Sequence, residues 1–301
     1  MSDRMPLKKR TMDSTYRDIN RQAILSADSG ELYRAQCLFR QNVNRHRCLT
    51  TLNNLAVFYA ENNSVDRNAR ERDGKWLALH YFEQALALEP TDKTFFAAAA
   101  VHYNCGAFAA AADYFEMAFE QRNTAAAAFN CGVARYRMGE YAKATACFAK
   151  ALPLCGKDTR ADVLTAYAFA VVYAGSRLPA SLAAEVESNA DDYAKFFLAY
   201  ASGDDVKAMQ YLKGAEAHFS LSAHAYAVVT ELFLRHGKAE QASTCVQQEI
   251  ESLKAQSAYG DIRMLHRLLA DSAYRNAQAR AYRYPLFLMR QCCYMDCPTH
   301  G

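Results

Sequence analysis

The sequence of 301 residues contains few residues that interrupt helices, with only 12 glycines and 6 prolines. It also lacks the alternating runs of β-branched residues that form half-buried strands. Alanine, the strongest helix former, is abundant. Hydrophobic residues make up 51% of the chain, which is enough for a sizeable core. These features favour an all-α fold of helices joined by short turns.

Long apolar segments are absent as well. No stretch approaches the roughly 20 apolar residues that cross a bilayer, and no apolar segment follows the first basic residues as it does in a signal peptide. Most of the ten cysteines lie within helical patterns, where a free thiol acts as a small hydrophobe. We therefore expect a cytoplasmic protein with no membrane contact.

The net charge of +3 is too small to indicate a nucleic acid or an anionic membrane as partner. The charge is uneven, however. Residues 1–50 carry ten Lys and Arg against five Asp and Glu, and residues 252–301 carry seven against three. The ends are therefore basic and the middle is acidic. RNA binding through the basic ends stays open as a minor alternative.

Catalytic signatures are also missing from the sequence. It contains no H-E-x-x-H, G-x-G-x-x-G or G-x-S-x-G motif. The eight histidines are scattered and form no recognisable ligand pair. We therefore expect a non-enzymatic protein with no catalytic residues and no cofactor.

What the sequence does contain is an internal repeat. The segments 92–121 and 125–152 align at a spacing of 33 residues, with Gly106 matching Gly139, Ala111 matching Ala144 and Phe115 matching Phe148. A glycine can end a helix in a left-handed conformation, and small residues let two helices cross closely. The aromatic residue then fills the space beside that crossing. Weaker copies are marked by further turn glycines: Gly30, Gly175, Gly203 and Gly237.

The segments NCGVARYRMGEYAKATACFAKAL and AVHYNCGAFAAAADYFEMAF resemble units of the tetratricopeptide repeat (TPR) family. So does LNNLAVFYAENN joined to WLALHYFEQALALEP. The resemblance implies a right-handed α-solenoid of about seven helix-turn-helix repeats, closed by a C-terminal capping helix. It also implies a concave surface lined by the first helix of each repeat.

This pattern divides the chain into four parts. We predict a flexible tail over 1–16, a TPR-like superhelix over 17–250, capping helices over 251–290 and a Cys-rich tail over 291–301. Residues 155–250 match the repeat less well, and a plain helical bundle is the alternative there.

Two segments depart from the repeat pattern. An insertion between Tyr59 and Ala78 is expected to be an exposed loop or a helix extension, with the turn glycine displaced to Gly74. The aromatic stretch AYRYPLFLM, interrupted by Pro285, either packs on the cap or awaits a partner.

The end of the chain contains four potential zinc ligands, Cys292, Cys293, Cys297 and His300. Their spacing does not match a standard zinc knuckle. A reactive, disordered tail or a disulfide-forming segment is therefore favoured over a metal site, and we expect no bound metal.

The concave stripe falls three and two residues before each small crossing residue and one residue after it. Asn54 and Asn130 on this stripe could clamp a ligand backbone, because an amide both donates and accepts hydrogen bonds. Its aromatic residues either anchor a ligand or pack between helices, and both interpretations are open. The predicted peptide-binding groove comprises Asn53, Asn54, Val57, Phe96, Ala100, Phe129, Asn130, Val133, Phe169, Tyr193 and Phe197.

The favoured function is a scaffold or adaptor that binds a protein or peptide in its concave groove. The stripe has no cluster of Lys and Arg to hold a terminal carboxylate, so an apolar or helical ligand is expected. A peptide-responsive regulatory sensor is the alternative. Self-association is also open, with the aromatic C-terminal segment lying in the groove of another copy.

Overall fold

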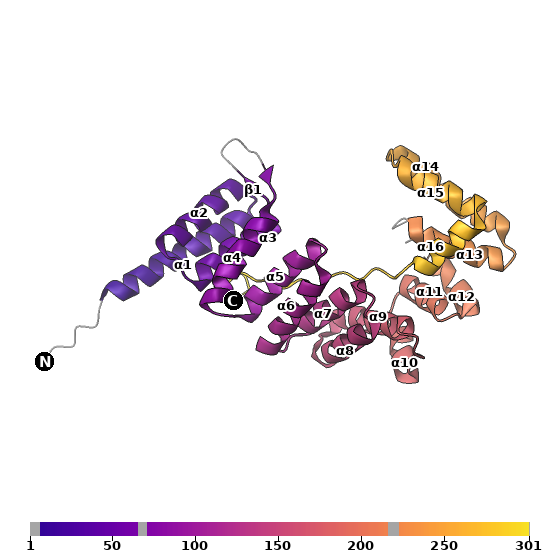
Figure 1. The fold of residues 1–301 in the computed structure, drawn as a ribbon, viewed down its shortest axis with the longest axis horizontal. Helices are drawn as coiled ribbons and strands as arrows, with labels where there is room; N and C mark the ends of the chain where they lie inside the picture. Colours follow the sequence, from indigo (N-terminus) through magenta and orange to yellow (C-terminus); the bar gives the residue numbers. More distant parts are fainter. Residues whose placement is uncertain (1–6, 66–70, 216–222, 301) are drawn as a thin grey trace. The chain divides into compact units, whose positions relative to one another are not determined.

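The computed structural model describes residues 7–65, 71–215 and 223–300, and nearly all the regular structure in these ranges is helical (Figure 1). The predicted all-α class is therefore confirmed. The chain forms two compact units, of which the first comprises residues 1–156 and 287–301 and the second residues 157–286.

The first unit is built from helices that pair with their neighbours in the chain. Its helices are α1 (Leu7–Asp28), α2 (Leu32–Arg45), α3 (Leu49–Glu61), α4 (Gly74–Leu88), α5 (Asp92–Asn104), α6 (Phe108–Gln121), α7 (Ala125–Arg137) and α8 (Tyr141–Ala151), followed by the 3-10 turn η1 (Leu152–Leu154). Helix α1 begins within the range 1–16 that is predicted to be a tail; residues 1–6 lie outside the described part.

The predicted turn glycines end the first helix of their pairs in the left-handed conformation. Gly106 has a φ of 78° and Gly139 a φ of 76°. After α5, the N–H of Ala107 donates to the carbonyl of His102 at 2.9 Å, and Glu140 repeats this bond to Arg135 after α7. These bonds satisfy carbonyls that would otherwise lack partners at the helix ends. Glycine is needed here because other residues are strained at positive φ.

The small residues lie where the paired helices cross. Ala111, Ala144, Phe115 and Phe148 are all completely buried. Helices α7 and α8 approach closely at Gly132 in α7, where an added Cβ would lie 2.5 Å from a ring carbon of Phe148. Such close packing fixes how each first helix presents its outer face.

The insertion between α3 and α4 differs from the expectation of a loop or helix extension. It contains a two-stranded antiparallel ribbon, β1 (Ser64–Val65) and β2 (Glu71–Arg72), whose connecting residues 66–70 lie outside the described part. Gly74 is predicted to be a turn glycine, but this is wrong: it is the first residue of α4. A Cβ there would lie 2.3 Å from the carbonyl oxygen of Tyr59, so only glycine lets α4 start against the end of α3.

The second unit also consists of helices. They are α9 (Lys157–Tyr173), α10 (Ala180–Asn189), α11 (Asp192–Ala201), α12 (Asp205–Ala215), α13 (Ala223–Arg235), α14 (Ala239–Ala255), α15 (Tyr259–Ala270) and α16 (Ser272–Ala281). Gly175, Gly203 and Gly237 again have positive φ, as the weaker repeat copies predict.

The last two helices cover α13. Leu265 and Leu268 of α15 are fully buried, and the guanidinium of Arg275 in α16 donates to the buried carboxylate of Glu231 at 2.9 Å. A buried ion pair needs good geometry to offset its desolvation, and Arg275 gains a further bond to the Leu268 carbonyl. The helices end at Ala281, so the capping helices do not extend to residue 290 as predicted.

No helix in the described part of the chain is both long enough and apolar enough to cross a membrane.

Replacing Gly132 with Ala tests the crossing of α7 and α8. We expect a loss of about 1–3 kcal/mol in the free energy of unfolding, because the added methyl group would overlap the fully buried ring of Phe148. Gly260→Ala in α15 is the matched control, since a Cβ there meets nothing within 4 Å. Equal denaturation midpoints for the two variants would contradict this packing.

Candidate functional site

A segment from the C-terminus of the chain lies against the first helices of the first unit. Residues 287–300 form no helix or strand, and their backbone is hydrogen-bonded by side chains from α1, α3, α5 and α7. Figure 1 shows this segment as the yellow trace that ends at the label C beside α4 and α5. We call residues 287–300 the tail segment.

Asn130 of α7 holds the tail segment at Met289. Its Nδ2 donates to the Met289 carbonyl at 2.9 Å, and its Oδ1 accepts from the Met289 N–H at 2.7 Å. The amide therefore pairs with both polar backbone groups of one residue. Asn130 is completely buried, so these bonds satisfy polar atoms that have no access to water.

Asn54 of α3 repeats the arrangement at Met295. Its Nδ2 donates to the Met295 carbonyl at 2.8 Å, and its Oδ1 accepts from the Met295 N–H at 2.7 Å. Asn20 of α1 adds a bond from its own Nδ2 to the same carbonyl at 3.2 Å, and its Oδ1 accepts from Asn54 at 2.9 Å. Both asparagines are buried.

Two further side chains bind the backbone between these points. Asn53 donates to the carbonyl of Cys293 at 2.9 Å, while its Oδ1 accepts from the hydroxyl of Thr94 at 2.9 Å. The ammonium of Lys93 donates to the carbonyl of Tyr294 at 3.0 Å. The consecutive carbonyls of residues 293–295 therefore all have side-chain partners.

The spacing of the two paired contacts follows from the repeat. Six residues of extended chain reach about 20 Å, and Asn54 and Asn130 stand at matching positions of α3 and α7, with α5 as the first helix of the pair between them. The position on α5 that matches Asn54 and Asn130 is Ala97, which has no amide.

One tail side chain is also deeply buried. Tyr294 is 5% exposed, and its ring stacks on Phe39 of α2 with centroids 5.9 Å apart and planes 6° from parallel. Burial raises the pKa of its hydroxyl well above the ordinary value, which keeps the phenol neutral. The tail segment is thus held by backbone hydrogen bonds and by an apolar contact.

The apolar residues predicted for this part of the groove are mostly core residues. Phe96 packs edge-on against Phe115 at 5.2 Å, and Phe129 packs against Phe148 at 5.3 Å, in each case on the second helix of the same pair. Val57 and Val133 are buried, and Ala100 is partly buried. Of the predicted groove residues, the asparagines are the ones that hydrogen-bond the tail backbone.

In the second unit, the predicted stripe meets aromatic residues that follow α16. Phe169 stacks on Tyr284 with ring centroids 4.2 Å apart, and Phe197 stacks on Tyr282 at 4.6 Å. Tyr193 lies 5.9 Å from Tyr284. The stretch AYRYPLFLM therefore covers this stripe through its tyrosines.

The predicted groove omits Asn20, Lys93 and Thr94. Asn20 stands three residues before the small residue Ala23, so the rule that selects Asn53 also selects Asn20 when it is applied to the first repeat. Lys93 and Thr94 lie a turn before the stripe positions of α5, and no sequence signal identifies them. The bound segment is not helical, and it places the apolar ring of Tyr294 against Phe39. The expectation of an apolar or helical ligand for a partner stays a prediction.

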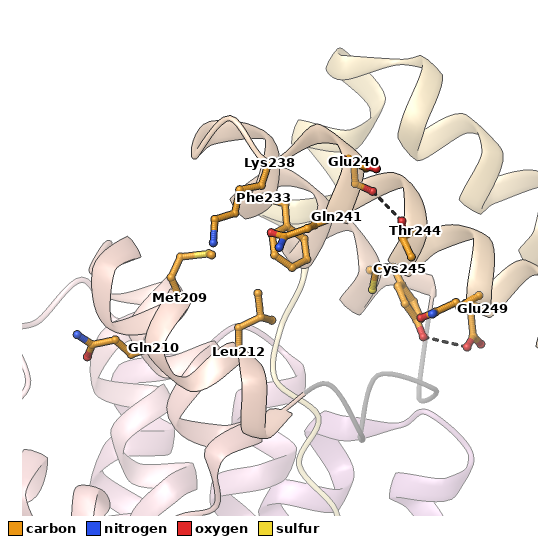
Figure 2. A pocket seen from close by; sticks show the side chains of 12 residues that line it. Met209, Gln210, Leu212, Phe233, Lys238, Glu240, Gln241, Thr244, Cys245 and Glu249 are labelled. Carbon is orange, nitrogen blue, oxygen red and sulfur yellow. Dashed lines mark hydrogen bonds between the residues drawn. The ribbon is translucent and has the colours of Figure 1, made fainter.

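A cavity of about 700 Å³ lies in the second unit between α12 and the pair α13 and α14. Figure 2 shows its lining, in which Met209 and Leu212 face Phe233 and Lys238. The hydroxyl of Tyr226 donates to Glu249 at 2.9 Å on its far wall. The lining is mixed, with apolar side chains beside Lys238, Glu240 and Cys245.

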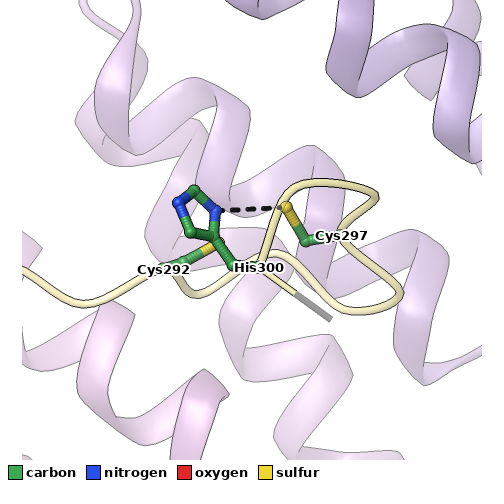
Figure 3. A group of neighbouring side chains, drawn as sticks. All are labelled: Cys292, Cys297 and His300. Atoms are coloured by element: carbon green, nitrogen blue, oxygen red, sulfur yellow. Dashed lines mark hydrogen bonds between the residues drawn. The ribbon is translucent and has the colours of Figure 1, made fainter.

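Three of the four possible metal ligands converge at the end of the tail segment. The ligand atoms of Cys292, Cys297 and His300 all lie within 4.8 Å of one another (Figure 3). Burial raises the pKa of the Cys297 thiol, but interactions with Thr299 and His300 outweigh burial and lower it to about 7. Cys293 is buried separately and donates to the carbonyl of Gln291.

Comparison with solved structures identifies the fold. A tetratricopeptide repeat protein from Parabacteroides merdae superposes with a TM-score of 0.58 at 16% identity, covering 84% of this chain and 99% of its own. PilF of Pseudomonas aeruginosa gives 0.49 at 16% identity, covering 81% and 98%, respectively. YrrB, described as a TPR protein with an unusual peptide-binding site, gives 0.46 at 17% identity, covering 69% and 98%. No protein-family model and no curated protein matches the sequence.

Replacing Asn130 with Ala is expected to free the backbone of Met289. Its N–H donates to Asn130 in the native chain, so its hydrogen exchange should accelerate at least about 10-fold in the variant. Asn130→Asp keeps an acceptor but loses the donor to the carbonyl, and should behave similarly. Mass spectrometry of peptides from 287–300 measures the exchange.

Asn104→Ala, at the exposed end of α5, is the control and should leave exchange in 287–300 unchanged. Native exchange rates in Asn130→Ala would show that this side chain does not hold the tail segment.

Proposed function

We propose that this chain, which folds as a TPR-like helical-repeat protein, is a protein-interaction scaffold whose first unit binds an extended peptide segment. The segment that lies there is the chain's own residues 287–300. A partner protein would present a segment of the same kind and replace it. The proposed role is binding, and it is non-enzymatic.

The paired hydrogen bonds of Asn54 and Asn130 carry this proposal. Each amide binds the N–H and the carbonyl of a single residue, which is the pattern that one strand offers another in a sheet. These hydrogen bonds recognise backbone groups of the segment and not its side chains. Any extended segment with free N–H groups at the two positions can therefore form them.

The contacts between these two points define the chemistry of the partner. The contact that buries Tyr294 against Phe39 favours an aromatic residue just before the second paired contact. Lys93 binds a carbonyl oxygen, not a carboxylate. The partner segment is therefore internal or long enough to pass through the groove, and its terminal carboxylate is not what is recognised.

The tail segment is tethered, so a partner in solution competes with it at a disadvantage. A tethered ligand acts at an effective concentration in the millimolar range. The apparent affinity for a partner is reduced by the fraction of molecules with an open groove. Release of the tail segment would therefore control access to the scaffold.

Cleavage of the tether tests this function. A specific protease site is inserted between Leu286 and Phe287, where Phe287 is 78% exposed, and the protein is cut and passed over a sizing column. We expect the freed segment to co-elute with the native array. In Asn54→Ala/Asn130→Ala the loss of four hydrogen bonds, at about 1 kcal/mol each, should weaken retention about 100- to 1,000-fold.

Asn104→Ala is the matched control and should retain the segment. A segment that leaves the native array, or stays equally well on the double variant, would refute the proposed groove. Capture from lysate then compares cut and uncut protein. A partner that binds only after the tail has been removed, and not to the double variant, would support the scaffold role.

A further inference from the structure

We propose that Cys292, Cys297 and His300 form a binding site for a zinc ion at the end of the tail segment. All three side chains point toward one place (Figure 3), and their ligand atoms lie within 4.8 Å of one another. The turn at 295–296, where Asp296 has a φ of 51°, returns the chain so that Cys297 faces Cys292.

The distance between Cys297 and His300 suits a tetrahedral metal. Zinc binds sulfur at about 2.3 Å and imidazole nitrogen at about 2.0 Å, which places a tetrahedral sulfur and nitrogen about 3.5 Å apart. The observed distance from Cys297 Sγ to His300 Nδ1 is 3.5 Å. The spacing therefore fits a shared ion as well as it fits a direct hydrogen bond.

The donor set selects the class of metal. Two thiolates and an imidazole are soft to intermediate ligands that favour zinc over magnesium or calcium. Three protein ligands leave the fourth position of the tetrahedron for water or for a group from a partner. Cys293 is not that ligand, because its thiol is buried and donates to the Gln291 carbonyl.

The groove holds the ligands ready. Between Cys292 and Cys297, three successive carbonyls are fixed by Asn53, Lys93 and Asn54. The three ligands are therefore already ordered in a docked tail segment, whereas a released segment would have to become ordered on binding the metal. A zinc ion should bind the docked form more tightly and so stabilise it.

This coupling rests on the proposed function, because it assumes that the tail segment leaves the groove. Zinc would then hold the groove shut, and chelation would favour its opening. A disulfide between Cys292 and Cys297 is the competing use of these thiols, but it gives His300 no part.

Cobalt titration of the full chain under reducing conditions tests the site. Cobalt serves as a spectroscopic substitute for zinc, because it gives thiolate charge-transfer absorption when cysteines bind it. We expect one equivalent to bind tightly, with displacement by zinc. Cys292→Ser, Cys297→Ser and His300→Ala should each weaken binding about 10- to 100-fold or more. Cys37→Ser and Cys105→Ser, at exposed cysteines, should not.

Absence of thiolate absorption, or absorption that persists unchanged in Cys297→Ser, would overturn the proposal. So would protein in which Cys292 and Cys297 resist reduction and no cobalt binds. Circular dichroism of each variant checks that the array remains folded.

The coupling is read from the cleaved protein. Zinc should slow release of the freed segment at least about 10-fold in the native sequence and have no effect in Cys297→Ser. Retention of the segment without any zinc effect would refute the metal's role and leave the groove standing. Loss of the segment from the native array without zinc would instead refute the groove, whatever the cobalt titration shows.

Discussion

A buried amide is costly when its donors or its acceptor lack partners, and four buried asparagines lie on the first helices of the first unit. Asn20, Asn53, Asn54 and Asn130 lie on the first helices at 0–1% exposure, where an unpartnered amide costs several kcal/mol. Helix backbones cannot supply the partners, because their own groups are already paired. The tail segment supplies them, so its position is part of the stability of the unit and not a surface accident.

The regular helical repeat places the asparagines where one tail segment can reach them. Gly106 and Gly139 end their helices in the same way, and the small residues Ala111 and Ala144 are buried at matching positions of the second helices. Asn54 and Asn130 therefore occupy equivalent places two repeats apart. Because their positions repeat, the two asparagines can bind the same tail segment at two residues.

Much of this framework could be predicted from the sequence. The 33-residue period located the turns, and the offsets from the crossing residues selected Asn54 and Asn130. The pattern failed at Gly74, because the insertion before it replaces a turn by a ribbon. It also omitted Lys93, whose long side chain reaches the tail backbone from outside the stripe.

The occupant of the groove could not be predicted in this way. Asn130 and Met289 are 159 residues apart in the chain, and a periodic pattern contains no information on such a pairing. The cysteine spacing is equally silent. Cys292, Cys297 and His300 converge only because a turn at Asp296 is held by contacts with distant helices.

The separation of the two paired contacts has a consequence for how this protein can change over evolutionary time. Because Asn54 and Asn130 form their hydrogen bonds with main-chain atoms of Met295 and Met289, both methionines can be exchanged for many other residues without altering these bonds. Proline is excluded at both positions, since it lacks the N–H that donates to the asparagine Oδ1. An insertion or deletion of one residue between 289 and 295 is also excluded, because it shifts one contact out of register. The groove therefore constrains the number of residues between positions 289 and 295 more strongly than it constrains their identity.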